Sequence, residues 1–372
     1  MTKFLLVAFL MLLAGGTKSS EAAPPKWVGV ASNSAFQPDL QVAYAKMRLT
    51  SLAGFTVVRQ IIPWSPGQPW PSPQDVQSIR NSVAAAELSG IRMILSVSPY
   101  GRAPIGPGQR RQYRTFLSTL AHSLQGGTTD KTGLTLVHGV KDFVIGNEVN
   151  SPSFWRPQKD AAKNYVTVLA QAYDELKAIS ADIRVYGGGL ASRGSVEYIK
   201  EMGKAFRESG RTKPLMDVLS YHPYGVNSSE SPEALHEGAY VGFADYKKLV
   251  AALEEAFNRT AQAGSRLPIA YMEYGVDSII PPHKRSLYHS AEPPSTKAVS
   301  EATQALFYRQ ALELAACQPT VIGTSFFHTS DESDLSAWQS GSFYADATPK
   351  SSLPAFRQAV VDAQSGAIAN CG

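Results

Sequence analysis

Two glutamates in this sequence follow apolar runs, and their setting gives the first indication of chemistry. Residues 143–150 read Phe-Val-Ile-Gly-Asn-Glu-Val-Asn, so Glu148 comes directly after a segment typical of a buried strand. Residues 268–275 read Pro-Ile-Ala-Tyr-Met-Glu-Tyr-Gly and place Glu273 in the same way. A carboxylate at the end of such a strand costs free energy unless it is paired or used. Two of them could act as proton donor and nucleophile on a glycosidic bond, provided that the fold brings them together.

Eight apolar segments predict the strands that would position these glutamates. Most are continuous rather than alternating in polarity, which is typical of parallel strands buried on both faces. They cover residues 27–32, 56–62, 92–97, 143–147, 183–187, 218–222, 269–273 and 320–327. Helical periodicity is found between and after them, at residues 77–88, 161–179, 246–262, 302–315 and 355–363. Gly90 and Gly264 lie where C-terminal caps of two of these helices are expected.

This alternation predicts an α/β protein with a single (β/α)8 TIM barrel over residues 23–372, rather than an open doubly wound sheet. The carboxyl ends of all barrel strands open on one face, so Glu148 and Glu273 would share the same barrel mouth. Irregular segments follow several strand ends, and we therefore expect extended loops on that face. They are residues 63–73, 98–108, 151–158, 226–242, 279–294 and 329–350.

The N-terminus has the pattern of a targeting segment. Lys3 precedes an apolar run, residues 4–14, that is too short to span a bilayer, and small residues around Ala22 suit cleavage. We predict a signal peptide over residues 1–22 and an exported protein, secreted or periplasmic, with no membrane anchor after cleavage. Loss of two lysines and one glutamate with this segment would lower the formal net charge from +4 to +3. So small a charge argues against a nucleic-acid partner.

The sequence contains two cysteines, Cys317 and Cys371. In an exported protein such a pair predicts a disulfide, and the alternative is two unrelated thiols. Neither cysteine is accompanied by residues that would make a metal site or a cysteine nucleophile. We therefore expect no metal and no cofactor.

The predicted barrel, with Asn147-Glu148 after the fourth strand and Glu273 after the seventh, resembles clan A of the retaining glycoside hydrolases, which includes cellulase-like and β-xylosidase-like families. The resemblance covers nearly the whole chain after the signal peptide. It implies that Glu148 is the general acid/base, that Asn147 holds the sugar 2-hydroxyl, and that Glu273 is the nucleophile. It also implies a β-linked oligo- or polysaccharide substrate and a retaining mechanism.

Three further residues match this clan. Arg59, at the end of the second predicted strand, resembles an arginine that hydrogen-bonds the nucleophile and would favour the ionised form of Glu273. His222 and Tyr224, in Tyr-His-Pro-Tyr at residues 221–224, resemble side chains that orient the acid/base and the nucleophile. The alternative for Arg59 is an ordinary buried ion pair, and the alternative for His222 is a core histidine.

The eighth strand departs from the clan, in which many members end this strand with a tryptophan beneath the first sugar. Here residues 325–329 read Ser-Phe-Phe-His-Thr, and we expect Phe327, His328 or the loop residue Trp338 to take that role. Trp64 and Trp155 lie close to strand ends and are predicted as further sugar platforms, because flat rings pack on the apolar faces of pyranose rings. The alternative for both is local anchoring of loops.

The sequence thus predicts an exported retaining O-glycosyl hydrolase. The same site could use a sugar in place of water as acceptor, which would make the protein a transglycosylase. A non-catalytic carbohydrate-binding barrel is a second alternative, and a barrel with structural glutamates is a third. The acidic group Asp331, Glu332 and Asp334 is interpreted as a solvated loop, with a calcium site as the alternative.

Overall fold

Eight parallel strands form a closed barrel in sequence order, β1 to β8, in a computed structural model that describes residues 23–369 and 371. The strands are β1 (Trp27–Ala31), β2 (Val57–Trp64), β3 (Arg92–Pro99), β4 (Asp142–Ile145), β5 (Arg184–Ala191), β6 (Val218–His222), β7 (Ile269–Tyr271) and β8 (Val321–Phe326). The predicted (β/α)8 TIM barrel is therefore confirmed, with each predicted strand in its place. The predicted signal peptide lies outside the described residues.

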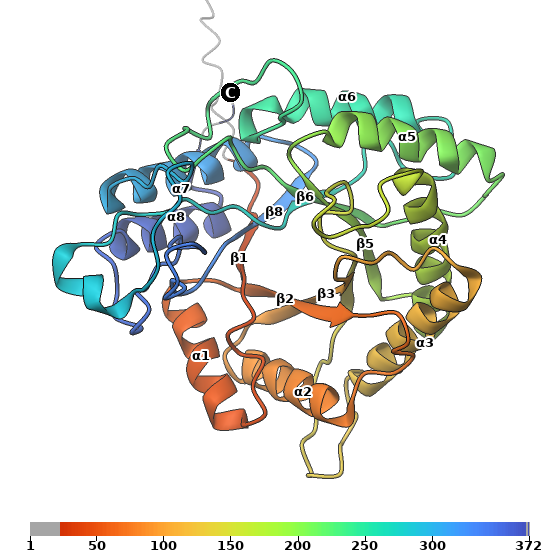
Figure 1. The fold of residues 1–372 in the computed structure, drawn as a ribbon, viewed down its shortest axis with the longest axis horizontal. Helices are drawn as coiled ribbons and strands as arrows, with labels where there is room; N and C mark the ends of the chain where they lie inside the picture. The colour runs from red at the N-terminus through yellow and green to blue at the C-terminus, as the bar shows by residue number, and fades with distance from the viewer. Residues whose placement is uncertain (1–22, 370, 372) are drawn as a thin grey trace, which may run out of the picture.

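Helices surround the strands, as Figure 1 shows in a view into the barrel. They are α1 (Leu40–Leu52), α2 (Pro73–Leu88), α3 (Pro107–Ser123), α4 (Ala161–Ile179), α5 (Ser195–Glu208), α6 (Tyr246–Phe257), α7 (Glu301–Ala316) and α8 (Leu353–Ser365), with short 3₁₀ helices η1 (Phe243–Asp245) and η2 (Pro282–Leu287). Gly90 follows α2 with φ +68°, as a C-terminal cap requires. The prediction for Gly264 is wrong, because α6 ends at Phe257, with Asn258 as its cap.

The barrel interior is built by alternation along each strand. On β2, Val57 belongs to the apolar cluster inside the barrel and Val58 to the larger cluster between strands and helices. The next residue, Arg59, therefore points inward again, one layer nearer the mouth at the carboxyl ends of the strands. The same rule on β6 places Val218 in the inner cluster and His222 two layers above it. Apolar layers at the bottom thus support a polar layer at the top.

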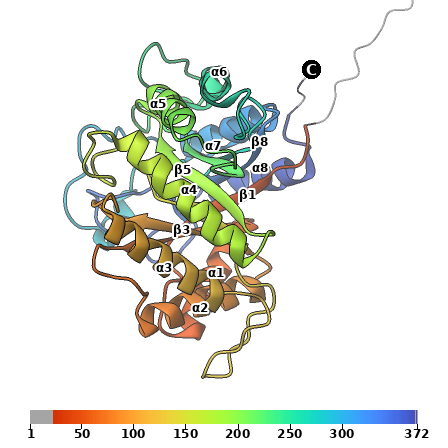
Figure 2. The same cartoon turned by 90° about the vertical axis from the view of Figure 1, so that its right-hand side faces the viewer.

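The opposite end of the barrel holds the chain termini. Cys317, at the end of α7, forms a disulfide with Cys371, as predicted. The backbone N–H of Ala23 donates to the carbonyl of Ala369, so the two ends of the described chain meet. Figure 2 shows both ends on one side of the molecule. Within the described residues, no helix combines the length and apolarity that crossing a membrane requires.

Candidate active site

The turn after β4 carries Glu148 in a constrained backbone. Gly146 has φ +92°, and a Cβ atom there would lie 2.6 Å from a methyl group of Val149, so only glycine fits. Glu148 itself has φ +42°, a left-handed conformation that non-glycine residues adopt at a cost of roughly 1–3 kcal/mol. Its N–H donates to the carbonyl of Gly189 on β5 at 2.6 Å. The barrel therefore fixes the direction in which the Glu148 side chain leaves the backbone.

Glu273, which lies two residues beyond β7, is held by a buried guanidinium. Nη1 of Arg59 lies 2.8 Å from Oε2 of Glu273, and the Arg59 side chain is fully buried. Arg59 also donates from Nε to the hydroxyl of Ser96 on β3 at 3.0 Å and from Nη2 to the side-chain oxygen of Asn147. These bonds leave Arg59 no freedom to turn away from the carboxylate. The structure thus joins the strand 2, strand 4 and strand 7 residues that the sequence singled out.

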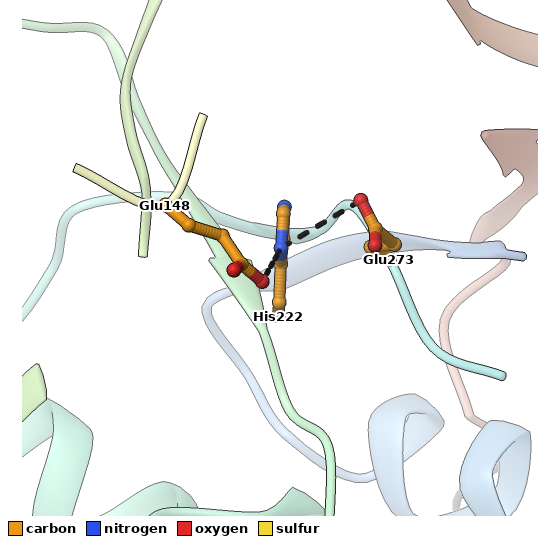
Figure 3. A group of neighbouring side chains, drawn as sticks. All are labelled: Glu148, His222 and Glu273. Carbon is orange, nitrogen blue, oxygen red and sulfur yellow. Dashed lines mark hydrogen bonds and ion pairs between the residues drawn. The ribbon is translucent and has the colours of Figure 1, made fainter. Parts of the chain in front are cut away.

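His222 lies between the two glutamates, as Figure 3 shows. Its Nδ1 is 3.0 Å from Oε1 of Glu148 and 3.7 Å from Oε2 of Glu273. One oxygen of each glutamate and a nitrogen of His222 all lie within 4.8 Å of one another. The two carboxyl groups are therefore close enough to act on one bond.

Burial shifts the pKa values of Glu148 and His222 in opposite directions, because it disfavours the charged form of each side chain. Removal from water raises the pKa of Glu148 to about 7, and the nearby Arg59 guanidinium opposes this shift only in part. Burial also lowers the pKa of His222 to about 3, against the attraction of Glu273, so the imidazole is neutral at pH 7. Glu273 instead lies 2.8 Å from the positively charged guanidinium of Arg59. One carboxyl can keep a proton near neutrality while a cation faces the other.

A cavity of about 720 Å³ opens above these residues. The hydroxyl of Tyr224 donates to Oε1 of Glu273 at 3.2 Å, and the ring of Tyr224 packs on Trp338 with centroids 5.4 Å apart. Trp338 in turn meets the edge of Phe327 at 5.4 Å. Trp338 and Phe327 both line the cavity, so a loop tryptophan stands near the position that the eighth strand leaves without one.

Three predicted sugar-contacting residues do not line this cavity. Trp64 and Trp155 are 0 % and 1 % exposed and pack edge-on against Tyr113 and Tyr165, respectively. Their prediction as sugar platforms is wrong, because both rings anchor loops to the helix layer. His328 is not among the residues that line the cavity, and its Nδ1 lies 3.1 Å from the carbonyl oxygen of Ala31. Of the three candidates for the strand 8 role, Phe327 and Trp338 alone reach the cavity.

The prediction of a solvated acidic loop after β8 is wrong for Asp331, which is 7 % exposed. Oδ1 of Asp331 lies 2.7 Å from Nζ of Lys350, and both side chains are fully buried. Lys350 also donates to Oγ of Ser278 at 2.8 Å and to the carbonyl of Gln339 at 2.7 Å. We call Lys350, Asp331 and Ser278 with Gln339 the loop clamp, because they join the loops after β7 and β8 beside Trp338.

Sequence patterns missed other residues of the site. Ser96 is buried on β3 and accepts the Arg59 Nε hydrogen bond. A serine between apolar residues of a buried strand could have indicated a polar inner layer. Arg193, Tyr240 and Glu230 also line the cavity, but they lie in loops where no periodicity applies.

The cluster of Glu148, His222 and Glu273 has the residue types of a metal site. The electrostatics argue against that use. The guanidinium of Arg59 already lies 2.8 Å from Glu273 and would repel a cation bound there. The Nδ1 atom of His222 already faces both carboxyl groups, at 3.0 Å from Glu148 and 3.7 Å from Glu273. The arrangement is better suited to proton transfer and nucleophilic attack than to holding an ion.

No family model matches the sequence, and no curated protein matches it. Solved structures match its fold. GH5_18 from Streptomyces cattleya, in complex with GlcNAc, has a TM-score of 0.61 and 15% identity, with 92% of this chain and 81% of that chain covered. A GH39 β-xylosidase from Caulobacter crescentus has a TM-score of 0.57 and 18% identity, covering 91% and 72%. An exo-β-1,4-mannosidase from Opitutaceae bacterium strain TAV5 has a TM-score of 0.58 and 16% identity, covering 94% and 62%.

With identities of 15% to 18%, these solved structures show similarity of fold only. The barrel resembles those of clan A glycoside hydrolases, as the sequence predicted.

Proposed function

We propose that this protein is a retaining glycoside hydrolase that cleaves O-glycosidic bonds by double displacement, with Glu148 as acid/base and Glu273 as nucleophile. One observation carries the proposal: an oxygen of each carboxyl group lies within 4.8 Å of one of the other, yet only Glu273 of the two forms an ion pair with the buried guanidinium of Arg59. In retaining enzymes the two carboxyl groups stand about 5 Å apart, whereas inverting enzymes need room for a water between them.

In the first step Glu148 gives its proton to the glycosidic oxygen as the bond from that oxygen to the anomeric carbon breaks. An oxygen of Glu273 forms a new bond to the same carbon, and the leaving sugar departs as an alcohol. Arg59 and Tyr224 hold Glu273 in line by hydrogen bonds at 2.8 and 3.2 Å. In the second step Glu148, now ionised, takes a proton from water, which attacks the anomeric carbon and releases Glu273.

The substrate that we propose is a β-linked oligo- or polysaccharide. The clan resemblance supports this, as do the sugars in the titles of similar structures, such as an exo-β-1,4-mannosidase and a complex with Manb1-4GlcNAc. The cavity has the aromatic wall that sugar rings favour, built by Tyr224, Phe327 and Trp338. We further propose that the protein is exported, which the disulfide between Cys317 and Cys371 supports.

Two other functions use the same surface. A transglycosylase would pass the sugar from Glu273 to a second sugar, and a binding barrel would hold sugar without turnover. The cavity favours neither over hydrolysis, but a binding protein would have no need of a raised pKa at Glu148.

The decisive experiment is trapping with 2-deoxy-2-fluoro β-D-mannoside, β-D-xyloside and β-D-glucoside that carry 2,4-dinitrophenolate leaving groups. Intact-mass and peptide mass spectrometry should find one glycosyl group on the peptide that contains Glu273. The Glu273→Gln variant is the matched control and should acquire no adduct. Turnover without any adduct, or an adduct on another carboxylate, would contradict the assignment. Release of disaccharide rather than free sugar on reactivation would indicate transglycosylation.

A further inference from the structure

Five carboxyl groups line the cavity, and each lies beside a group that can donate a hydrogen bond to it or carry a positive charge. They are Glu148, Glu230, Glu273, Asp277 and Glu332. An imidazole nitrogen lies within 3.0 Å of each of Glu148, Glu230 and Glu332. Glu273 has Arg59 at 2.8 Å, and Asp277 accepts from the backbone N–H of Gln339 at 2.6 Å. Protein groups next to these carboxyl groups therefore offset most of their negative charge.

Arg193 is the basic residue of the cavity lining, and its charge is not compensated. Across residues 23–369 and 371, no carboxylate forms an ion pair with it, and its side chain is exposed. The guanidinium lies over the ring of Tyr240, 5.9 Å from the centroid. Cation–π contact holds one face of the guanidinium while its N–H groups stay available at the edge. The cavity thus contains a positioned cation that lacks an anion.

The position of Arg193 indicates which part of a substrate it would meet. Asn150, two residues after Glu148, donates from its side-chain nitrogen to the carbonyls of Ala191 and Arg193 at 2.9 and 3.0 Å. Asn150 also accepts from the N–H of Ala191 at 2.9 Å. The loop that carries Arg193 is therefore fastened to the loop that carries the proposed acid.

A general acid must reach the oxygen of the leaving group, so the leaving group lies on the Glu148 side of the cavity. Tyr100 and Phe154 border the cavity there, with their rings 5.7 Å apart, and Arg193 lies in the loop after the neighbouring strand β5. Phe327 and Trp338 come from the opposite side of the barrel, after β8, and border the part that would hold the sugar attacked by Glu273. Arg193 would therefore face the departing sugar.

We propose that Arg193 binds a carboxylate on the leaving group, so that this protein cleaves next to a sugar that carries an acid, as a uronic acid does. The inference rests on the proposed function and adds the class of the departing sugar. A guanidinium presents parallel N–H donors that match the two oxygens of a carboxylate, and such bonds are stronger than those to neutral hydroxyls. Recognition of this kind selects one leaving group without taking part in bond cleavage.

The test compares two aryl glycosides with the same sugar, one releasing 4-hydroxybenzoate and the other 4-hydroxybenzamide. β-D-Mannosides, β-D-xylosides and β-D-glucosides of both phenols would be used. We expect Arg193→Gln to lower the carboxylate-to-carboxamide ratio of kcat/KM about fivefold to twentyfold. The comparison of ratios removes the intrinsic difference between the phenols. Added salt should lower the ratio for the wild type, because it screens an exposed ion pair.

Two matched variants sharpen the result. Arg102→Gln removes an exposed arginine from another loop of the same face that does not line the cavity, and it should leave the ratio unchanged. Arg193→Lys keeps the charge but loses the planar fork, and its ratio should lie between wild type and Arg193→Gln. A ratio that Arg193→Gln leaves unchanged, or that Arg102→Gln lowers equally, would overturn the inference.

Binding separates this inference from the proposed function. Calorimetry with the Glu273→Gln protein would measure affinity for the same glycosides without turnover. If the wild type hydrolyses none of these glycosides, the proposed function fails. The role of Arg193 is still supported if Glu273→Gln binds the carboxylate glycoside more tightly than the carboxamide glycoside and the double variant Glu273→Gln/Arg193→Gln does not. Equal affinity for the two glycosides would overturn the role of Arg193 even if hydrolysis is observed.

Discussion

Two clusters of buried charge lie at the carboxyl ends of the barrel strands, and they differ in whether their hydrogen bonds are complete. In the loop clamp, Nζ of Lys350 has three acceptors for its three protons, and Lys350 and Asp331 have no exposed side-chain area. In the proposed catalytic cluster, Glu148 and Glu273 keep 18 % and 11 % of their side chains exposed to the cavity. The clamp is closed, and the catalytic cluster is open toward a ligand.

Shifted pKa values do not separate the two clusters. Burial raises the pKa of Asp331 and lowers that of Lys350, in the same way that burial raises the pKa of Glu148. Structural ion pairs and catalytic groups both pay this desolvation cost. The difference is that Glu148 can still exchange its proton with a bound molecule. A shifted pKa therefore indicates function only where the group also borders a cavity.

The largest effect is expected where the open cluster loses its nucleophile. Glu273→Gln keeps the size of the side chain and its contact with Arg59, but an amide cannot form the glycosyl-enzyme. We expect kcat to fall about 10⁴-fold or more, with circular dichroism and the melting temperature nearly unchanged. Glu201→Gln, an exposed change on α5, is the matched control. Wild-type kcat in Glu273→Gln would remove Glu273 from the mechanism.

The closed cluster should respond in stability. Lys350→Met leaves Asp331 buried without its cation, and we expect a loss of about 3–5 kcal/mol in the free energy of unfolding, measured with urea. Lys141→Met, which removes an exposed lysine 3.9 Å from Asp182, should cost less than about 1 kcal/mol. Asp331→Asn in the Lys350→Met background should recover part of the loss. Equal costs for Lys350→Met and Lys141→Met would show that the clamp is not a stabilising unit.

The pH dependence of kcat/KM tests the proposed role of Glu148 as the proton donor. Because Glu148 must donate a proton, we expect kcat/KM to fall as pH rises through about 7, roughly tenfold per unit above that value. In Glu148→Gln, the residual activity on a 2,4-dinitrophenyl glycoside, which needs no acid, should lack this fall. A basic limb that persists in Glu148→Gln would assign it to another group.

The contribution of Glu148 to the stability of the folded protein should fall as the pH rises from about 4.5 to about 7. The pKa of Glu148 is higher in the folded protein than its ordinary value of 4.5, so the folded state binds this proton more tightly. The stabilisation is complete below about 4.5 and is lost as pH rises to about 7. The melting temperature of wild type relative to Glu148→Gln should therefore decline between these values.

The sequence predicts the barrel and the catalytic cluster for the same physical reason. Buried parallel strands must be continuously apolar, so Asn147-Glu148, Glu273 and Arg59 stand out as polar residues where such runs end or turn inward. No helix is predicted over α1, α3 or α5. Polar residues or Gly and Pro neighbours obscure the periodicity of α1 and α3. The apolar residues Tyr198, Ile199, Met202 and Phe206 of α5 do recur at helical spacing, so the sequence contains a signal for this helix that the prediction overlooks. The local sequence pattern thus predicts the strands of this barrel better than its helices.

The sequence does not predict how loops fold over the mouth. Asp331 belongs to an acidic run that looks solvated, and only the three-dimensional return of the chain brings Lys350 to it. Trp64 and Trp155 have the same sequence context as a sugar platform, and whether a ring faces a cavity or a helix depends on loop geometry. Long-range pairing in loops carries no periodic signature, so these contacts had to come from the structure.

The smallest effect that we predict separates a half-buried tryptophan that lines the cavity, Trp338, from a fully buried one, Trp155. Trp338 packs on Tyr224, whose hydroxyl donates to Glu273, and lines the cavity. We expect Trp338→Ala to raise KM about tenfold with a smaller change in kcat, since stacking on sugar is lost but both glutamates remain. Trp338→Phe should restore most of the affinity. Trp155→Ala should instead lower stability by about 3–5 kcal/mol and leave the KM of the folded fraction unchanged. If Trp338→Ala changes only stability, then Trp338 belongs with the closed, structural part of this face, and Phe327 is left as the aromatic platform of the open part.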